Sequence, residues 1–518
     1  MGTERICRKP TITEALTILI IDALIISYGV LSIKTESGWT FGLGLSAHIP
    51  LFLAATVSAI SGMVFLKTPW RKLEDGMVSA ITVAMQAIII LLAIGGLVGS
   101  WIQSGVVPTL IFYGLNMLSP RFFLLASLLI CSVVSLSTGS SWSTSGTVGI
   151  ALMGIGAGLG IPAPVTAGFI LSGAYFGDKI SPLSDTTNLA PAVSGAELFD
   201  HIKAMLWTTL PTLCIVMGIA WFMGTKYGAG ALDATKISLI QQMMASEFPI
   251  SLMGFVPPLL VLTLAAMKIP AIPGIVSGML LGSILALVHG LDIGSVLGAL
   301  HSGYSTSLIT KVSEAGDLAA LAEAVKGSAM QLSGTADVEM YKSVGGLLKD
   351  LLNRGGMSSM LGTISLILMA LTLGGIMETC GYLEVILERL MQTVRTVGGL
   401  ITSVIASCIF ANMFLGDQYL AIVIPGRMFK PGFEKFEVGG RKLAPRMLSR
   451  SLEDSGTLTS VLVPWNTCGA YNSGVLGVAT LEYLPYAFLN WLNPLVAIAL
   501  TYMGIGVYWK DPESEPKK

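Results

Sequence analysis

Long apolar runs separated by short polar segments dominate this chain. A helix needs about 20 mostly apolar residues to cross the hydrocarbon core of a bilayer. Continuous runs of about this length lie near residues 12–33, 48–66, 76–98, 204–224, 248–267, 271–289, 358–378 and 484–508. The pattern predicts an all-α polytopic membrane protein.

Other apolar stretches are interrupted by Gly, Pro, Ser and Thr. An irregular backbone at membrane depth is tolerated only where protein shelters it or where it lines a water-filled cavity. We therefore expect re-entrant hairpins and broken helices around a polar site. The interrupted stretches are 121–137 followed by 146–160, 162–194, 400–415 followed by 419–426, and 456–479.

The interruptions recur in register. The offset between Gly95 and Gly374 (374 − 95 = 279) also aligns the polar break at 135–142 with that at 414–421. Each series continues to a second polar break, and counting spans starts the second series on the opposite side. Interrupted segments at matching places in two inverted repeats indicate a transporter's site. The alternative is that the glycines only pack helices.

This reading divides the chain into four parts. N-terminal scaffold helices occupy residues 1–73, and a first repeat occupies 74–227, with a hairpin and broken helix at 162–194. Connecting helices occupy 228–357 and include an extramembrane loop at 311–357. A second repeat occupies 358–518, with a hairpin and broken helix at 452–479. Basic residues before the first run and in the 427–450 segment favour a cytoplasmic N-terminus, in a multi-pass protein of the cell inner membrane.

Composition supports a membrane location and narrows the function. Charged residues make up 12% of the chain and hydrophobic ones 53%, whereas soluble domains carry about 25% charged residues. The net charge of −1 gives no basic field for nucleic acid. The cysteines and histidines show no metal or nucleophile–base spacing, so we expect no cofactor and no enzyme. A channel is a further alternative, which flux saturation and counter-ion coupling would distinguish.

The segment 172–191 carries the densest polar chemistry. Asp178 and Asp185 are seven positions apart, which places them on one face of a continuous helix. Pro182 is expected to break that helix and free carbonyls beside Asp185. A charge at mid-bilayer costs about 2.5–3.5 kcal/mol, so such residues persist when paired or functional. Lys179 is the expected partner of Asp178.

Sodium is a hard cation, and discontinuous helices supply the oxygen ligands that it prefers. The candidate residues for cation binding and proton exchange are Asp185, Asp178, Ser184, Thr186, Thr187, Asn188, Asn466 and Thr467. Of these, Asp185, Thr186, Asn188, Asn466 and Thr467 are the expected Na⁺ ligands. The alternative is that the Ser, Thr and Asn side chains only cap half-helices.

The remaining candidates are secondary. Thr138, Ser140 and Ser141 would form the first re-entrant tip. Asp417 would be a cavity residue or a helix cap, and Asp454 would gate a cytoplasmic entrance or cap a helix.

Three runs, at 138–164, 172–191 and 452–471, resemble the NhaC family of sodium/proton antiporters, part of a larger ion-transporter superfamily. The resemblance extends from about residue 12 to 508, and SDTTNLAP and PWNTCGAY are its specific motifs. One departure is SSWSTS at 140–145, where the family pattern leads us to expect an SWGT-like spacing after the glycine. This departure bears on ion selectivity.

The resemblance implies a scaffold domain, a mobile transport domain, elevator-type alternating access and a homodimer in the lipid bilayer. The transported ions would be Na⁺ and H⁺, competing for one carboxylate, first Asp185 and then Asp178. Some members exchange Na⁺-lactate for H⁺-malate and others carry amino acids, so a Na⁺-coupled organic-anion exchanger and an amino-acid carrier remain alternatives. An organic anion would need a cationic group or a helix N-terminus near the breaks. Only Lys179 and Arg427 are expected cationic donors.

Overall fold

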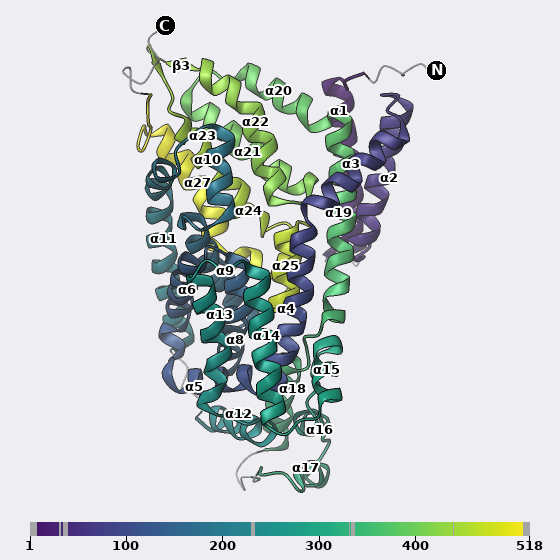
Figure 1. Ribbon diagram of the computed structural model, residues 1–518, viewed down its shortest axis with the longest axis vertical. Helices are drawn as coiled ribbons and strands as arrows, with labels where there is room; N and C mark the ends of the chain where they lie inside the picture. The colour runs from purple at the N-terminus through teal and green to yellow at the C-terminus, as the bar shows by residue number, and fades with distance from the viewer. Residues whose placement is uncertain are drawn as a thin grey trace.

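A computed structural model describes residues 8–30, 33–34, 40–228, 234–330, 332, 337–438 and 440–510. The helices form an elongated bundle, with both termini near one end (Figure 1). The strands described form two short antiparallel ribbons, β1 (Ile33–Lys34) with β2 (Thr40–Phe41) and β3 (Glu437–Val438) with β4 (Arg441–Lys442).

Within the described ranges, seven helical segments are long and apolar enough to cross a membrane. Two bent helix pairs, 235–247 with 252–266 and 480–486 with 488–502, reach the same length together. The prediction of an all-α polytopic membrane protein is confirmed. The seven segments are Ile12–Val30, Met85–Gln103, Pro120–Thr138, Leu198–Tyr227, Ala271–Val288, Met357–Cys380 and Val397–Leu415.

The N-terminal region contains α1 (Ile12–Val30), α2 (His48–Val64), α3 (Trp70–Val83) and α4 (Met85–Gln103). The sequence suggested one continuous helix over 76–98, but the helix breaks at Ala84 between α3 and α4. The two helices on either side of the break pack against different neighbours. Helix α3 packs on α19 (Leu361–Cys380), and α4 packs on α14 (Ala271–Val288).

Two series of helices carry the interrupted segments. The first series continues from α4 through α5 (Val106–Met117), α6 (Pro120–Thr138), α7 (Ser141–Thr144), the π-helical turn η1 (Ser145–Gly149), α8 (Ile150–Gly158), α9 (Ala163–Ile180), α10 (Asp185–Ser194) and α11 (Leu198–Gly228). The second continues from α19 through α20 (Tyr382–Thr393), α21 (Val397–Leu415), α22 (Gln418–Lys435), α23 (Pro445–Leu452), the π-helical turn η4 (Glu453–Thr457), α24 (Leu458–Ser460), α25 (Thr467–Leu476), α26 (Thr480–Tyr483), the 3₁₀ turn η5 (Leu484–Tyr486) and α27 (Phe488–Tyr502).

Helix lengths recur between the two series. Helices α5 and α20 each have 12 residues, α6 and α21 each have 19, and α10 and α25 each have 10. Both ten-residue helices end at a glycine in the left-handed region, Gly195 (φ 82°) and Gly477 (φ 70°). Glycine adopts this conformation without the steric cost that a side chain brings, so it ends a helix sharply.

The connecting region is helical throughout most of its length. The segment 311–357, expected as an extramembrane loop, contains helices, and α18 (Val338–Leu352) buries Leu348 and Leu352 in the largest apolar core. These helices gather at the end of the bundle opposite the termini (Figure 1). Besides α14, the region holds α12 (Ala234–Glu247), the 3₁₀ turn η2 (Leu252–Phe255), α13 (Val256–Ala266), α15 (Ile293–Ser302), α16 (Leu308–Glu314), α17 (Leu318–Val325), α18 (Val338–Leu352) and the 3₁₀ turn η3 (Met357–Met360).

Candidate ion-binding site

The first broken helix consists of α9 and α10. Helix α9 ends at Ile180, and Pro182 follows in a short non-helical segment. Proline has no backbone N–H to donate to a helical hydrogen bond, so the helix ends before it. A new helix, α10, begins at Asp185. Ser184 caps the new helix, with its Oγ accepting from the backbone N of Thr187 at 3.5 Å.

The second broken helix runs from α23 through η4 and α24 to α25. Its break follows Ser460, and α25 restarts at Thr467. The Oδ1 atom of Asn466 caps α25 by accepting from the backbone N of Cys468 at 3.0 Å. Each break is therefore followed by the N-terminal turn of a half-helix, where a side chain satisfies a backbone donor.

A cavity of about 510 Å³ lies where these breaks meet the turn at residues 138–141 (the first tip). The predicted site residues that line it are Thr138, Ser140, Ser141, Asp178, Ser184, Asp185, Thr186, Asp417 and Thr467. Further lining residues come from α4 and from the turn between α13 and α14. Residues of both series thus share one polar cavity.

Two of the cavity carboxylates are engaged by protein donors. Asp178 Oδ2 accepts from the backbone N of Ser141 at 3.0 Å and from its hydroxyl at 2.6 Å, which ties α9 to the first tip. Asp417 Oδ1 accepts from the backbone N of Tyr419 at 2.8 Å, and its Oδ2 accepts from the hydroxyl of Thr467 at 3.1 Å. Asp417 is therefore both a helix cap and a cavity residue.

Asp185 differs from both of these carboxylates. Its side chain is exposed and lines the cavity at the first residue of α10. Over the parts of the chain that the structure describes, its carboxylate has no hydrogen bond or ion pair with protein groups. The hydroxyls of Ser184 and Thr186 lie beside it in sequence, 3.1 Å from each other. Asp185 is thus a solvent-accessible carboxylate with unused binding capacity.

Three candidate site residues do not line the cavity and instead make hydrogen bonds that hold the breaks in shape. The Thr187 hydroxyl donates to the carbonyl of Lys179 at 2.9 Å. The Asn188 Nδ2 atom donates to the carbonyl of Ser184 at 2.7 Å. The Asn466 Nδ2 atom donates to the side-chain oxygen of Asn412 at 3.1 Å.

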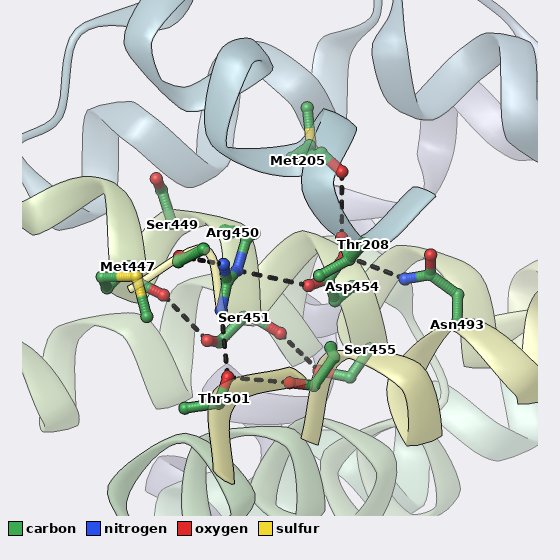
Figure 2. Close-up of polar contacts among 12 residues, drawn as sticks. Met205, Thr208, Met447, Ser449, Arg450, Ser451, Asp454, Ser455, Asn493 and Thr501 are labelled. Atoms are coloured by element: carbon green, nitrogen blue, oxygen red, sulfur yellow. Dashed lines mark hydrogen bonds and ion pairs between the residues drawn. The ribbon is translucent and has the colours of Figure 1, made fainter. Parts of the chain in front are cut away.

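The expected pairing of Lys179 with Asp178 is wrong. Successive residues of a helix point about 100° apart, and the buried ammonium of Lys179 pairs with Asp454 instead. Asp454 also accepts from the hydroxyl of Thr208 at 2.9 Å and from Nδ2 of Asn493 at 2.8 Å (Figure 2).

Asp454 therefore lies in a buried ion network inside a helical turn and does not cap a helix, while its role as a gate stays a prediction. It sits within η4 and is fully buried, as is Arg450, whose Nε lies 3.7 Å from Asp454 Oδ2 (Figure 2). The adjacent Glu453 is also buried, and its Oε1 accepts from the cavity hydroxyl of Thr186 at 2.9 Å. The network thus connects the two broken helices behind the cavity.

Several lining residues were missed from the sequence. Trp142 follows the first tip directly, and its ring stacks on Tyr471 of α25 with centroids 4.1 Å apart. Gln418 and Tyr419 adjoin Asp417 in sequence, which was a usable signal. Lys268 lies far from either break in the sequence, and only the tertiary fold brings it to the cavity.

A bundle of membrane-spanning helices with a polar cavity at two broken helices defines the class of secondary transporters. The family model described as the Na⁺/H⁺ antiporter family matches residues 173–335 and 324–505. The chain belongs to this family.

Curated relatives cover nearly the whole chain. The Na⁺/H⁺ antiporter NhaC of Alkalihalophilus pseudofirmus is 36% identical over 90% of this chain and 92% of its own length. The malate-2H⁺/Na⁺-lactate antiporter of Bacillus subtilis is 35% identical over 97% of each chain. The arginine/ornithine antiporter ArcD of Halobacterium salinarum is 33% identical over 92% of this chain and 90% of its own length.

Proposed function

We propose that this protein exchanges Na⁺ for H⁺ across the cytoplasmic membrane by alternating access. The single observation that carries the proposal is the position of Asp185, a carboxylate that lines a polar cavity and has no protein partner over the described residues. Hydroxyls of Thr186 and Thr467 line the same cavity and offer neutral oxygens to a hard cation. Family membership supports the same pair of ions.

In this mechanism, Asp185 binds either Na⁺ or a proton, and Asp178 is the second carboxylate that can do so. Thr186 and Thr467 add oxygen ligands to Na⁺, while Asn188 and Asn466 hold the two breaks in the required shape. Either cation neutralises the carboxylate, which lowers the cost of carrying the site through the membrane. Exchange results because Na⁺ and the proton occupy the carboxylate in turn.

We further propose two inverted repeats, a scaffold domain, a transport domain that moves as an elevator, and a homodimer. The recurring helix lengths support the repeats. The participation of α4 and the α13–α14 turn in the cavity lining supports a boundary between a fixed and a moving part. The N-terminus is placed in the cytoplasm because basic residues precede the first span.

A second candidate is exchange of a small organic substrate together with Na⁺. The cavity of about 510 Å³ falls within the range of about 300–1,000 Å³ that small-molecule sites occupy. A single cation needs far less space. The B. subtilis and H. salinarum relatives, named for lactate with malate and for arginine with ornithine, make these compounds the natural probes.

The test uses purified protein in liposomes that enclose a pH-sensitive dye. External Na⁺ should raise the internal pH, because each entering Na⁺ drives protons out. Protein-free liposomes, and K⁺ in place of Na⁺, are the controls. A response to Na⁺ alone supports the antiporter. A response that appears only with malate, lactate, arginine or ornithine supports the second candidate, and no response under any of these conditions contradicts both.

A further inference from the structure

The turn between α13 and α14 places a lysine at the cavity. Lys268 adopts a left-handed backbone conformation with φ 62° and is among the cavity-lining residues. L-residues other than Gly, Asn and Asp rarely adopt this conformation, and such residues cluster at functional sites. The backbone N of Lys268 donates to the carbonyl of Ala265 at 2.9 Å, so backbone contacts hold the turn.

A second lysine provides an internal comparison. Lys67, in the turn after α2, has φ 58° and is also exposed, but it does not line the cavity. Over the described ranges these two are the only residues other than glycine with positive φ. A lysine in such a turn therefore does not by itself indicate function. What distinguishes Lys268 is that it shares a cavity with three carboxylates.

Of these carboxylates, Asp185 is the one available to Lys268. Asp178 and Asp417 already accept hydrogen bonds from Ser141 and Thr467. Within the described part of the chain, neither the Lys268 ammonium nor the Asp185 carboxylate is in an ion pair. Two opposite charges thus line one polar cavity and both remain exposed.

We propose that Lys268 is a tethered counter-cation that competes with Na⁺ for Asp185. While neither ion is bound, the ammonium neutralises the carboxylate, and an arriving Na⁺ or proton displaces it. No covalent or redox step is involved, since one cation replaces another at the same oxygens. This inference rests on the proposed function, because it takes Asp185 as the ion-binding carboxylate. It makes Lys268 a determinant of the apparent Na⁺ affinity.

The test compares Lys268→Asn, Lys268→Arg and Lys67→Asn. Asparagine tolerates the left-handed conformation, so the first and third variants remove the same charge from matched turns. Lys268→Asn should lower the apparent KM for Na⁺ in the liposome assay by about two- to fivefold, the size of solvent-exposed ion pairs. Lys268→Arg and Lys67→Asn should stay at the wild-type value. Added choline chloride should narrow the difference by screening.

An unchanged KM in Lys268→Asn, or an equal shift in Lys67→Asn, contradicts the proposal. A measurement of Na⁺ binding tests the role of Lys268 independently of Na⁺/H⁺ exchange. Na⁺ should raise the thermal unfolding temperature of the purified protein, followed by tryptophan fluorescence, and Lys268→Asn should reach half of this effect at a correspondingly lower Na⁺ concentration. If this binding shift occurs in protein that shows no exchange, the inference stands and the proposed function fails.

Discussion

The half-helices α10 and α25 are alike in backbone and different in chemistry. Each has 10 residues, begins at a side-chain cap and ends at a left-handed glycine. Helix α10 begins with Asp185, whose carboxylate has no partner over the described residues. Helix α25 begins with Thr467, whose hydroxyl already donates to Asp417. The first break offers unused charge, whereas the second offers polar groups already bonded to each other.

This difference indicates a division of roles between the two halves. One monovalent cation needs one negative charge to balance it, and further unbalanced carboxylates would make the unloaded site costly to move through lipid. Asp178 and Asp417 already accept hydrogen bonds from protein donors, which take up part of their capacity to bind a cation. We therefore expect the first break to determine ion occupancy and the second to determine the shape of the cavity.

The largest effect on stability is expected from removing the buried ion pair of Lys179 with Asp454, which joins the two broken helices. Asp454→Asn should lower the free energy of unfolding by about 3–5 kcal/mol, because it leaves the buried charges of Lys179 and Arg450 without their carboxylate. Lys179→Met should cost less, because Asp454 then still pairs with Arg450. The double variant should recover part of the Asp454→Asn loss, since the charge of Lys179 is then gone and only Arg450 lacks its carboxylate. Thermal unfolding followed by tryptophan fluorescence provides the measurement.

A matched control comes from the exposed pair of Lys9 with Glu384. Lys9→Met should cost less than about 1 kcal/mol, as is usual for solvent-exposed ion pairs. A double variant at Lys179 and Asp454 that loses the sum of both single effects would show that the two charges do not act as a pair.

The next largest effect separates Asp185 from Asp417. Asp185→Asn should slow Na⁺/H⁺ exchange by about 30-fold or more, a loss of about 2 kcal/mol, because it removes the carboxylate on which both ions depend. Asp417→Asn removes the same charge but keeps an oxygen that can accept from Thr467 and cap α22. Its exchange rate should fall by less than about fivefold, a loss of about 1 kcal/mol. Initial rates of the dye signal compare the variants.

Asp75→Asn is the control for this comparison, because Asp75 is an exposed carboxylate on α3 outside the cavity. It should exchange Na⁺ at the wild-type rate. An equal loss of exchange rate in Asp185→Asn and Asp417→Asn would contradict the division of roles between the two breaks. A wild-type exchange rate in Asp185→Asn would show that Asp185 is not the ion-binding carboxylate.

Local chemistry made much of the fold and part of the site predictable. Apolar run lengths indicate membrane helices, and Pro182 marks the first break, because these signals act within a few residues. Side-chain direction is different, since it depends on packing between distant helices. Adjacency suggested that Lys179 pairs with Asp178, yet its partner lies 275 positions away at Asp454. The position of Lys268 at the cavity could not be predicted from its sequence neighbours, because the cavity forms only when distant segments fold together.

The smallest expected effect concerns the two caps. Ser184 Oγ lies 3.5 Å from the backbone N that it caps, whereas Asn466 Oδ1 lies 3.0 Å from its donor and its amide also donates to Asn412. Ser184→Ala should therefore lower the free energy of unfolding by about 0.5–1 kcal/mol, and Asn466→Ala by about 1–2 kcal/mol. Asn466→Ser, which keeps an oxygen that can cap α25 but not the amide donor, should fall between wild type and Asn466→Ala in the same thermal unfolding assay. A larger loss from Ser184→Ala than from Asn466→Ala would mean that the second break is not the more tightly bonded one.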